Sequence, residues 1–207
     1  LTCTKTVELN KDNQTINEYN RYLTDWDRTK GLELKEENGY VCLNNYVDNT
    51  VHILRWLLDL AMNGNEGQSY LNHNFVKNLD VSDIDETKIS ALKKVFVDSR
   101  VIMIYGAAGT GKTTLMNYVT DLMDGRTKLY LTKTHTALEN LQRRIMAPGA
   151  SSKFMGIDQF INSNMLSKYD VIFVDECSTI DNRTMIRLLK KIDNEALLVF
   201  AGDIHQI

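Results

Sequence analysis

Residues Gly106–Thr114 carry the clearest chemical signal in the chain. They follow the apolar run Val101–Tyr105 and read Gly-Ala-Ala-Gly-Thr-Gly-Lys-Thr-Thr. The glycines let the backbone turn tightly enough for its N–H groups to face phosphate oxygens, Lys112 supplies a positive charge, and Thr113 offers magnesium a hydroxyl. We therefore predict a nucleoside triphosphate site made of nine consecutive residues, Gly106, Ala107, Ala108, Gly109, Thr110, Gly111, Lys112, Thr113 and Thr114.

Two further groups of polar residues follow apolar runs later in the chain. Asp175 and Glu176 follow Val171–Val174, where Asp175 could hold the magnesium shell and Glu176 could polarise an attacking water. Standing alone, such a pair would equally be two solvated acids after a strand, but its place after a complete phosphate loop favours catalysis. Gly202–Gln206 follows the last apolar run, and its carboxylate and carboxamide are expected beside the γ-phosphate.

These groups need elements that bring them to one place. From residue 86 onward we expect helices over 86–96, 112–123, 136–146, 157–165 and 182–192, and strands over 100–105, 128–132, 171–174 and 196–201. Near-continuously apolar strands separated by helices predict an α/β fold, a mainly parallel sheet covered on both faces. Active residues are then expected beyond the carboxyl ends of the strands.

The first 85 residues read differently. Their patterning predicts helices over 15–26 and 51–62, a short strand over 39–47, a loop at 63–69 and an acidic connection at 80–86. No catalytic group of residues is evident there. We predict a mostly helical accessory region over 1–85 and a nucleotide-binding domain over 86–207.

Composition places limits on the class of protein. The apolar content of 43% and charged content of 25% are ordinary for a globular protein. No signal peptide or membrane span is evident, and three scattered cysteines favour a reduced, cytoplasmic setting. The first residue is not Met, which suggests an excised piece. Residues 86–155 hold 11 Lys and Arg against 5 Asp and Glu, so a local basic surface is expected despite the net charge of −3.

Four motifs in order carry a family resemblance: Gly106–Thr113, Thr132–Leu138, Asp175–Ser178 and Gly202–Gln206. Over residues 86–207 the chain resembles the first motor domain of superfamily 1 helicases, and within them the RecD-like and Pif-like branch. The resemblance implies a RecA-like P-loop fold, ATP and Mg²⁺ as cofactors, and ATP-driven movement along single-stranded nucleic acid, for which we expect DNA.

The same resemblance implies residue roles. Lys112 contacts phosphate, Thr113 and Asp175 hold Mg²⁺, Glu176 activates water, and Gln206 senses the γ-phosphate. A second set is expected to contact the nucleic-acid backbone: Thr134, His135, Thr136 and Asp158. Thr134 or Thr136 is equally a helix N-cap by its type and place.

The sequence departs from the family in three places. Gly156 stands where the family usually has Thr. No adenine-reading glutamine occurs in Glu86–Ser90, which leaves adenine selectivity open. The chain ends soon after Gly202–Gln206. The resemblance implies a second RecA-like domain that supplies arginine contacts to the γ-phosphate, so we expect this fragment alone to hydrolyse ATP poorly.

Two other classes of protein share part of this pattern. A regulatory or AAA+-like ATPase switch has the phosphate loop and the Asp-Glu pair but acts on protein partners; a polar sensor such as Asn is expected on its last strand, so Gly202–Gln206 favours the helicase. A small-molecule kinase is disfavoured by the Asp-Glu pair.

Overall fold

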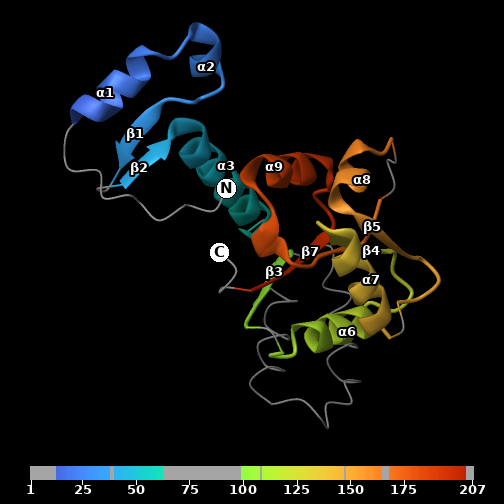
Figure 1. Ribbon diagram of the computed structural model, residues 1–207. Helices are drawn as coiled ribbons and strands as arrows, with labels where there is room; N and C mark the ends of the chain where they lie inside the picture. Colours follow the sequence, from blue (N-terminus) through green and yellow to red (C-terminus); the bar gives the residue numbers. More distant parts are fainter. Residues whose placement is uncertain are drawn as a thin grey trace.

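A five-stranded parallel sheet forms the centre of the molecule. The computed structural model describes residues 13–37, 40–62, 99–107, 109–146, 148–164 and 168–203. The strands are β3 (Val101–Tyr105), β4 (Lys128–Thr132), β5 (Ser152–Gly156), β6 (Val171–Val174) and β7 (Leu197–Gly202). They lie in the order β3-β7-β6-β4-β5, and every neighbouring pair is parallel (Figure 1). The predicted α/β fold with a mainly parallel sheet is confirmed.

Helices cover both faces of this sheet. One face carries α6 (Lys112–Leu122) and α7 (His135–Arg144); the other carries α3 (Asn44–Met62), α8 (Ile157–Asn162) and α9 (Asn182–Lys191). Alternate strand residues serve the two cores. On β7, for example, Val199 packs with the α6 and α7 side chains, and Leu198 and Phe200 pack with those of α8 and α9.

Helix α3 belongs to the core of the sheet although it lies in the N-terminal region. Ile53, Leu57 and Leu60 are buried in the same cluster as Leu129 and Ile172 of the sheet. Not even α3, at 19 residues the longest described helix, is long and apolar enough to cross a membrane. The predicted boundary between residues 85 and 86 lies outside the described residues, so the division into two domains stays a prediction.

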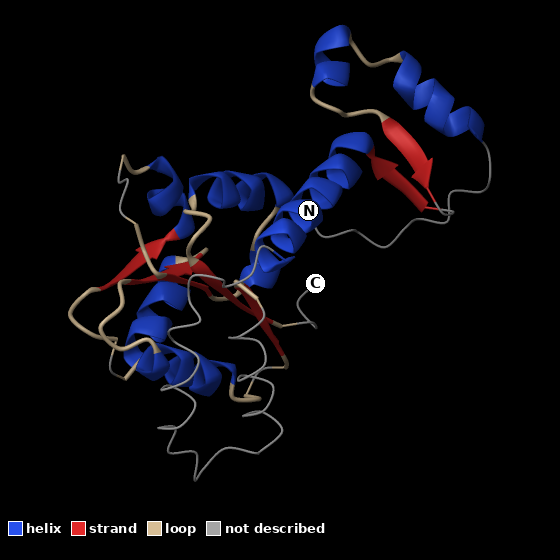
Figure 2. Cartoon of the chain, turned by 180° about the vertical axis from the view of Figure 1, so that it is seen from behind, coloured by secondary structure: helices blue, strands red, loops and turns tan. Residues whose placement is uncertain are grey.

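The rest of the N-terminal region extends from the far end of α3. Its described part comprises α1 (Asn13–Arg21), α2 (Asp25–Thr29) and the antiparallel pair β1 (Leu34–Glu37) and β2 (Tyr40–Leu43) (Figure 2). The prediction of one helix over 15–26 is wrong, because Thr24 and Asp27 form a capping box that starts a separate helix.

Other element predictions differ in detail. Strand β2 is shorter than the predicted range, and α8 ends at Asn162, before residue 165. Strands β1 and β5 were not predicted, since their sequences Leu-Lys-Glu-Glu and Ser-Lys-Phe-Met-Gly lack an apolar run. The helix expected over 86–96, the loop over 63–69 and the connection over 80–86 lie outside the described residues.

Candidate nucleotide-binding site

The phosphate loop joins β3 to α6 in the predicted strand-loop-helix arrangement. Gly109 and Gly111 have φ values of 81° and 86°, a left-handed conformation in which a side chain would be strained. Gly106 is required for another reason, because a Cβ there would lie 2.5 Å from Thr110 Oγ1. The glycines therefore allow a tightly folded loop. Ala108 lies outside the described residues.

The start of α6 has the features of an anion site. Its N-cap is Gly111, which makes no side-chain cap hydrogen bond to the first turn. The first-turn amides and the positive end of the helix dipole face the loop, an arrangement that favours phosphate. Lys112 lies across the loop, and its Nζ donates to the carbonyl oxygens of Gly106 at 2.6 Å and Ala107 at 2.9 Å. The loop therefore fits a phosphate group.

The acidic pair lies at the carboxyl end of β6. The Asp175 N–H donates to the Leu131 carbonyl oxygen at 2.9 Å, which ties the end of β6 to β4. The Glu176 N–H donates to Asp175 Oδ1, also at 2.9 Å. Glu176 adopts φ 53° and ψ 37°, and is the one non-glycine residue with positive φ in the described part of the chain. Such backbone strain is concentrated at functional sites.

Burial weakens the acidity of both members of this pair. Burial raises the pKa of Asp175 above its ordinary value, although Lys112 and Arg144 act in the opposite direction. Burial, followed by the charge of Asp175, raises the pKa of Glu176, again opposed by Arg144. A carboxylate oxygen is a ligand that hydrated Mg²⁺ prefers, and a second carboxylate beside it can act as a general base. The two acids at this strand end suit these two tasks.

The end of β7 completes this side of the site. The Gly106 N–H donates to the Gly202 carbonyl oxygen at 3.3 Å, so the last described strand abuts the phosphate loop. A Cβ on Gly202 would lie 2.8 Å from Cys177 Sγ, so only glycine allows β7 to approach the turn after β6 this closely. Asp203 follows as a buried residue. Gln206, the predicted γ-phosphate sensor, lies outside the described residues.

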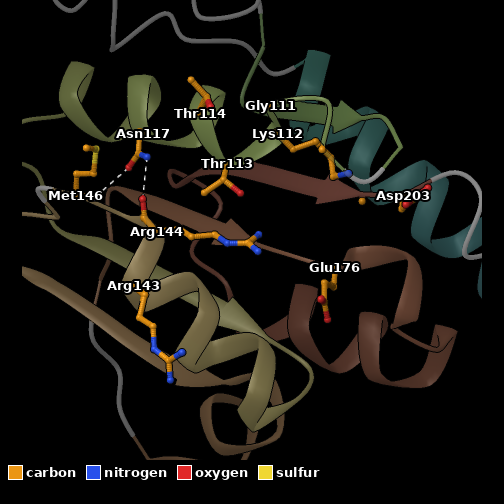
Figure 3. Close-up of a pocket in the computed structure, with 12 residues that line it drawn as sticks. Gly111, Lys112, Thr113, Thr114, Asn117, Arg143, Arg144, Met146, Glu176 and Asp203 are labelled. Atoms are coloured by element: carbon orange, nitrogen blue, oxygen red, sulfur yellow. Dashed lines mark hydrogen bonds between the residues drawn. The ribbon is translucent and has the colours of Figure 1, made fainter.

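A cavity of ≈ 680 Å³ lies between these groups. Its lining includes the phosphate loop residues Gly109, Gly111, Lys112, Thr113 and Thr114, together with Glu176, Gly202 and Asp203 (Figure 3). Three of the four predicted motifs therefore meet at one cavity, as the parallel sheet required.

The opposite wall was not predicted. Asn117 of α6, Arg143 and Arg144 at the end of α7, and Met146 after it also line the cavity. No motif marks these residues. The sequence signal that pointed toward them was the local excess of basic residues over 86–155, to which Arg143 and Arg144 contribute.

The predicted nucleic-acid contacts lie apart from this cavity, at the carboxyl ends of β4 and β5. Thr134 is the N-cap of α7, its hydroxyl accepting from the Ala137 N–H at 3.2 Å. His135 and Thr136 are exposed, and His135 Nδ1 lies 3.3 Å from Glu139 Oε1. Asp158 pairs with Lys133 at 3.2 Å. The structure thus brings the 133–136 segment and Asp158 together, while their role stays a prediction.

Known proteins resemble parts of this chain. An uncharacterized protein of Methanocaldococcus jannaschii is 34% identical over 160 residues, which are 66% of this chain and 13% of that protein. The chain therefore spans only a small part of that relative's length. Among solved structures, the UvsW helicase from bacteriophage T4 is similar with a TM-score of 0.45 and 12% identity, over 74% of this chain and 59% of that one. The PRRSV nsp10 helicase has a TM-score of 0.32 and 18% identity, over 50% and 25%.

A family match extends over the whole nucleotide-binding region. Residues 84–207 match the model described as an AAA domain. That range contains the phosphate loop, the acidic pair and the described sheet. Since it covers more than half of the 207 residues, the chain belongs to the AAA domain family and contains a P-loop NTPase domain.

Proposed function

We propose that this chain is the first motor domain, with its N-terminal region, of an ATP-dependent superfamily 1 helicase of the RecD-like and Pif-like branch. In this proposal it binds ATP with Mg²⁺. A second RecA-like domain of the full-length protein would let hydrolysis drive translocation on single-stranded nucleic acid, for which we expect DNA. The observation that carries the proposal is the meeting of the phosphate loop, Glu176 of the acidic pair and the Gly202–Asp203 strand end at one cavity.

The nucleotide half of the proposal assigns a task to each group. The α6 amides and Lys112 would bind the phosphates, and Thr113 and Asp175 would hold Mg²⁺. Bound Mg²⁺ would neutralise charge on the phosphates. Glu176 would accept the proton of the attacking water; its raised pKa makes it a stronger base than an exposed glutamate. Gln206 would sense the γ-phosphate.

The nucleic-acid-binding half of the proposal rests on the segment that follows β4, apart from the cavity. The Thr134 hydroxyl already caps α7, so Lys133, His135 and Thr136 are the groups most available to a phosphate backbone. Asp158, at 3.2 Å from Lys133, would orient that ammonium group rather than meet the strand directly. Contacts of this kind bind the backbone without reading the base sequence.

Membership of the AAA domain family also favours a second function, an ATPase switch that acts on protein partners. Its nucleotide site would use the same residues in the same roles. The two functions differ in one property, since a switch that acts on proteins should not bind nucleic acid.

Binding of single-stranded nucleic acid therefore distinguishes the two functions. We expect the chain, in the presence of a non-hydrolysable ATP analogue and Mg²⁺, to bind a labelled oligo-dT in fluorescence anisotropy, with affinity that falls as salt rises. Lys133→Ala should weaken binding and reduce the slope of log affinity against log salt by about 0.7, the contribution of one phosphate contact to a single strand. Lys168→Ala is the matched control, because this exposed lysine lies just before β6, at the amino ends of the strands, whereas Lys133 follows the carboxyl end of β4.

Nucleotide binding is measured separately, by calorimetry with the same ATP analogue. Lys112→Ala should abolish detectable binding, and unchanged affinity would contradict the phosphate-loop assignment. Lys112-dependent nucleotide binding without any oligonucleotide binding would favour the protein-directed switch. Equal effects of Lys133→Ala and Lys168→Ala would show that the segment between β4 and α7 does not bind the nucleic acid.

A further inference from the structure

Arg144 occupies a position that none of the sequence motifs explains. It is the last residue of α7, and it lines the cavity opposite the phosphate loop. Its guanidinium group extends between Thr113 and Glu176, whereas the side chain of Arg143 is directed away from them (Figure 3). A positive charge therefore lies on the side of the cavity where the acidic pair and the magnesium-binding hydroxyl meet.

The backbone around Arg144 is held from both sides. Asn117 Nδ2 donates to the Arg144 carbonyl oxygen at 2.9 Å, and the Met146 N–H donates to Asn117 Oδ1 at 3.2 Å. Ile145, between them, is buried in the core with α6. This anchoring fixes the base of the side chain relative to α6, the helix that begins with Lys112. The guanidinium is thus aimed by the fold and not by a mobile loop.

The two adjacent arginines differ in their ionic partners. Arg143 Nη2 lies 3.7 Å from Glu139 Oε2, one turn earlier on the exposed face of α7. Arg144 forms no ion pair within 4 Å with any described residue, yet it is close enough to lower the pKa of both Asp175 and Glu176. Its charge is therefore available to the cavity.

A triphosphate brings more negative charge than Lys112 and one Mg²⁺ can neutralise, particularly beside two carboxylates. A guanidinium suits this need, since its planar fork can donate two hydrogen bonds to one phosphate group and it stays charged at any ordinary pH.

We propose that Arg144 binds the terminal phosphate of the nucleotide from within the same domain, so that the site distinguishes a triphosphate from a diphosphate before a second domain closes over it. This inference rests on the proposed nucleotide site. It assigns to α7 a contact that the family resemblance leaves to the second motor domain.

Calorimetric titration of the chain with a non-hydrolysable ATP analogue and with ADP, each with Mg²⁺, tests the proposal. Arg144→Ala should weaken the triphosphate analogue about ten-fold, the order of one charge-assisted hydrogen bond, and leave ADP affinity nearly unchanged. Arg144→Lys should fall between, because it keeps the charge and loses the fork. Arg143→Ala removes an equal charge from a side chain that is directed away from Thr113 and Glu176, so it should weaken the triphosphate analogue far less than Arg144→Ala does.

Other results would overturn it. Equal losses for both nucleotides, accompanied by a lower melting temperature without nucleotide, would mean that Arg144 only supports the fold. A loss in Arg143→Ala as large as that in Arg144→Ala would indicate a general electrostatic field, and no loss in Arg144→Ala would exclude the contact. If the wild-type chain bound neither nucleotide, the proposed function itself would fail, which is a distinct result.

Discussion

Glu176 lies in the turn that follows β6, two residues after the strand ends at Val174, and its backbone dihedrals are in the left-handed region. A residue with a Cβ pays about 1–3 kcal/mol for such a conformation. The strained turn brings the carboxylate to the cavity while Asp175 stays anchored to the Glu176 amide. We infer that stability is given up here to position the base that the proposed hydrolysis needs.

A pair of amide substitutions separates the backbone from the side chain. Glu176→Asn and Glu176→Gln both remove the carboxylate, and both should suppress hydrolysis in the full-length protein while nucleotide binding persists. Asparagine tolerates left-handed dihedrals better than glutamine. Urea unfolding should therefore give Glu176→Asn a free energy of unfolding about 0.5–1 kcal/mol above that of Glu176→Gln. Equal stabilities would mean that the turn is not strained.

At the scale of an element, α9 shows how a helix is fixed in place beside the site. Its N-cap Asp181 accepts from the Thr184 N–H at 2.9 Å and from the Thr184 hydroxyl at 2.7 Å. Asn182 Nδ2 donates to Thr50 Oγ1 at 2.7 Å, which joins α9 to α3. The sheet-facing side of α9 buries Leu188 and Leu189. The cap, the cross-link and the apolar stripe all specify the same position for this helix.

The cap should make stability depend on pH. Burial alone would raise the pKa of Asp181, but the hydrogen bonds from Thr184 outweigh it, so the folded pKa lies below the ordinary value. The contribution of Asp181 is therefore present above the unfolded pKa of about 3.9 and is lost as the pH falls toward the folded pKa. At pH 7 Asp181→Ala should lower the free energy of unfolding by about 1 kcal/mol.

Asp181→Asn supplies the control, since asparagine caps a helix about as well but does not titrate. Urea unfolding at a series of pH values should show little loss for this variant at pH 7 and a flatter profile below pH 4. If Asp181→Ala lost the same free energy at pH 3 as at pH 7, the charge of Asp181 would contribute nothing.

At the scale of the whole molecule, α3 connects the N-terminal region to the nucleotide-binding domain. Leu57 is 8% exposed and packs in the core with the sheet, whereas its neighbour Leu58 is 57% exposed. The helix thus completes one face of the sheet that positions the acidic pair and the end of β7. We infer that the N-terminal region is required for the stability of the site as well as for whatever its distal part contacts.

Two adjacent leucines test this dependence. Leu57→Ala should lower the free energy of unfolding of the whole chain by about 2–4 kcal/mol, the cost of a cavity in a packed core. Leu58→Ala should change it by less than about 0.5 kcal/mol, because its side chain is largely in solvent. Thermal unfolding of the two variants, followed by a signal from the sheet, would reveal this difference in the free energy of unfolding. Similar values for the two variants would mean that α3 folds independently of the sheet.

Much of the fold and part of the site could be predicted because they depend on local patterns. The glycines of Gly106–Gly111 encode a backbone conformation, and the apolar runs before them and before Asp175 encode strands, of which β6 is buried throughout and β3 at alternate residues. Helix 15–26 failed because a capping box outweighs periodicity, and β5 was missed because a polar sequence can pair as an edge strand.

The sequence by itself therefore determined the phosphate loop, the acids and the parallel arrangement that aligns them. Only the tertiary structure decided that β7, the last described strand in the chain, lies between β3 and β6 and so brings Asp203 to the loop. It also decided that the end of α7 places Arg144 in the cavity. The physical reason is that neighbouring residues encode backbone shape and burial, whereas proximity across the sheet arises only when all strands and helices pack together.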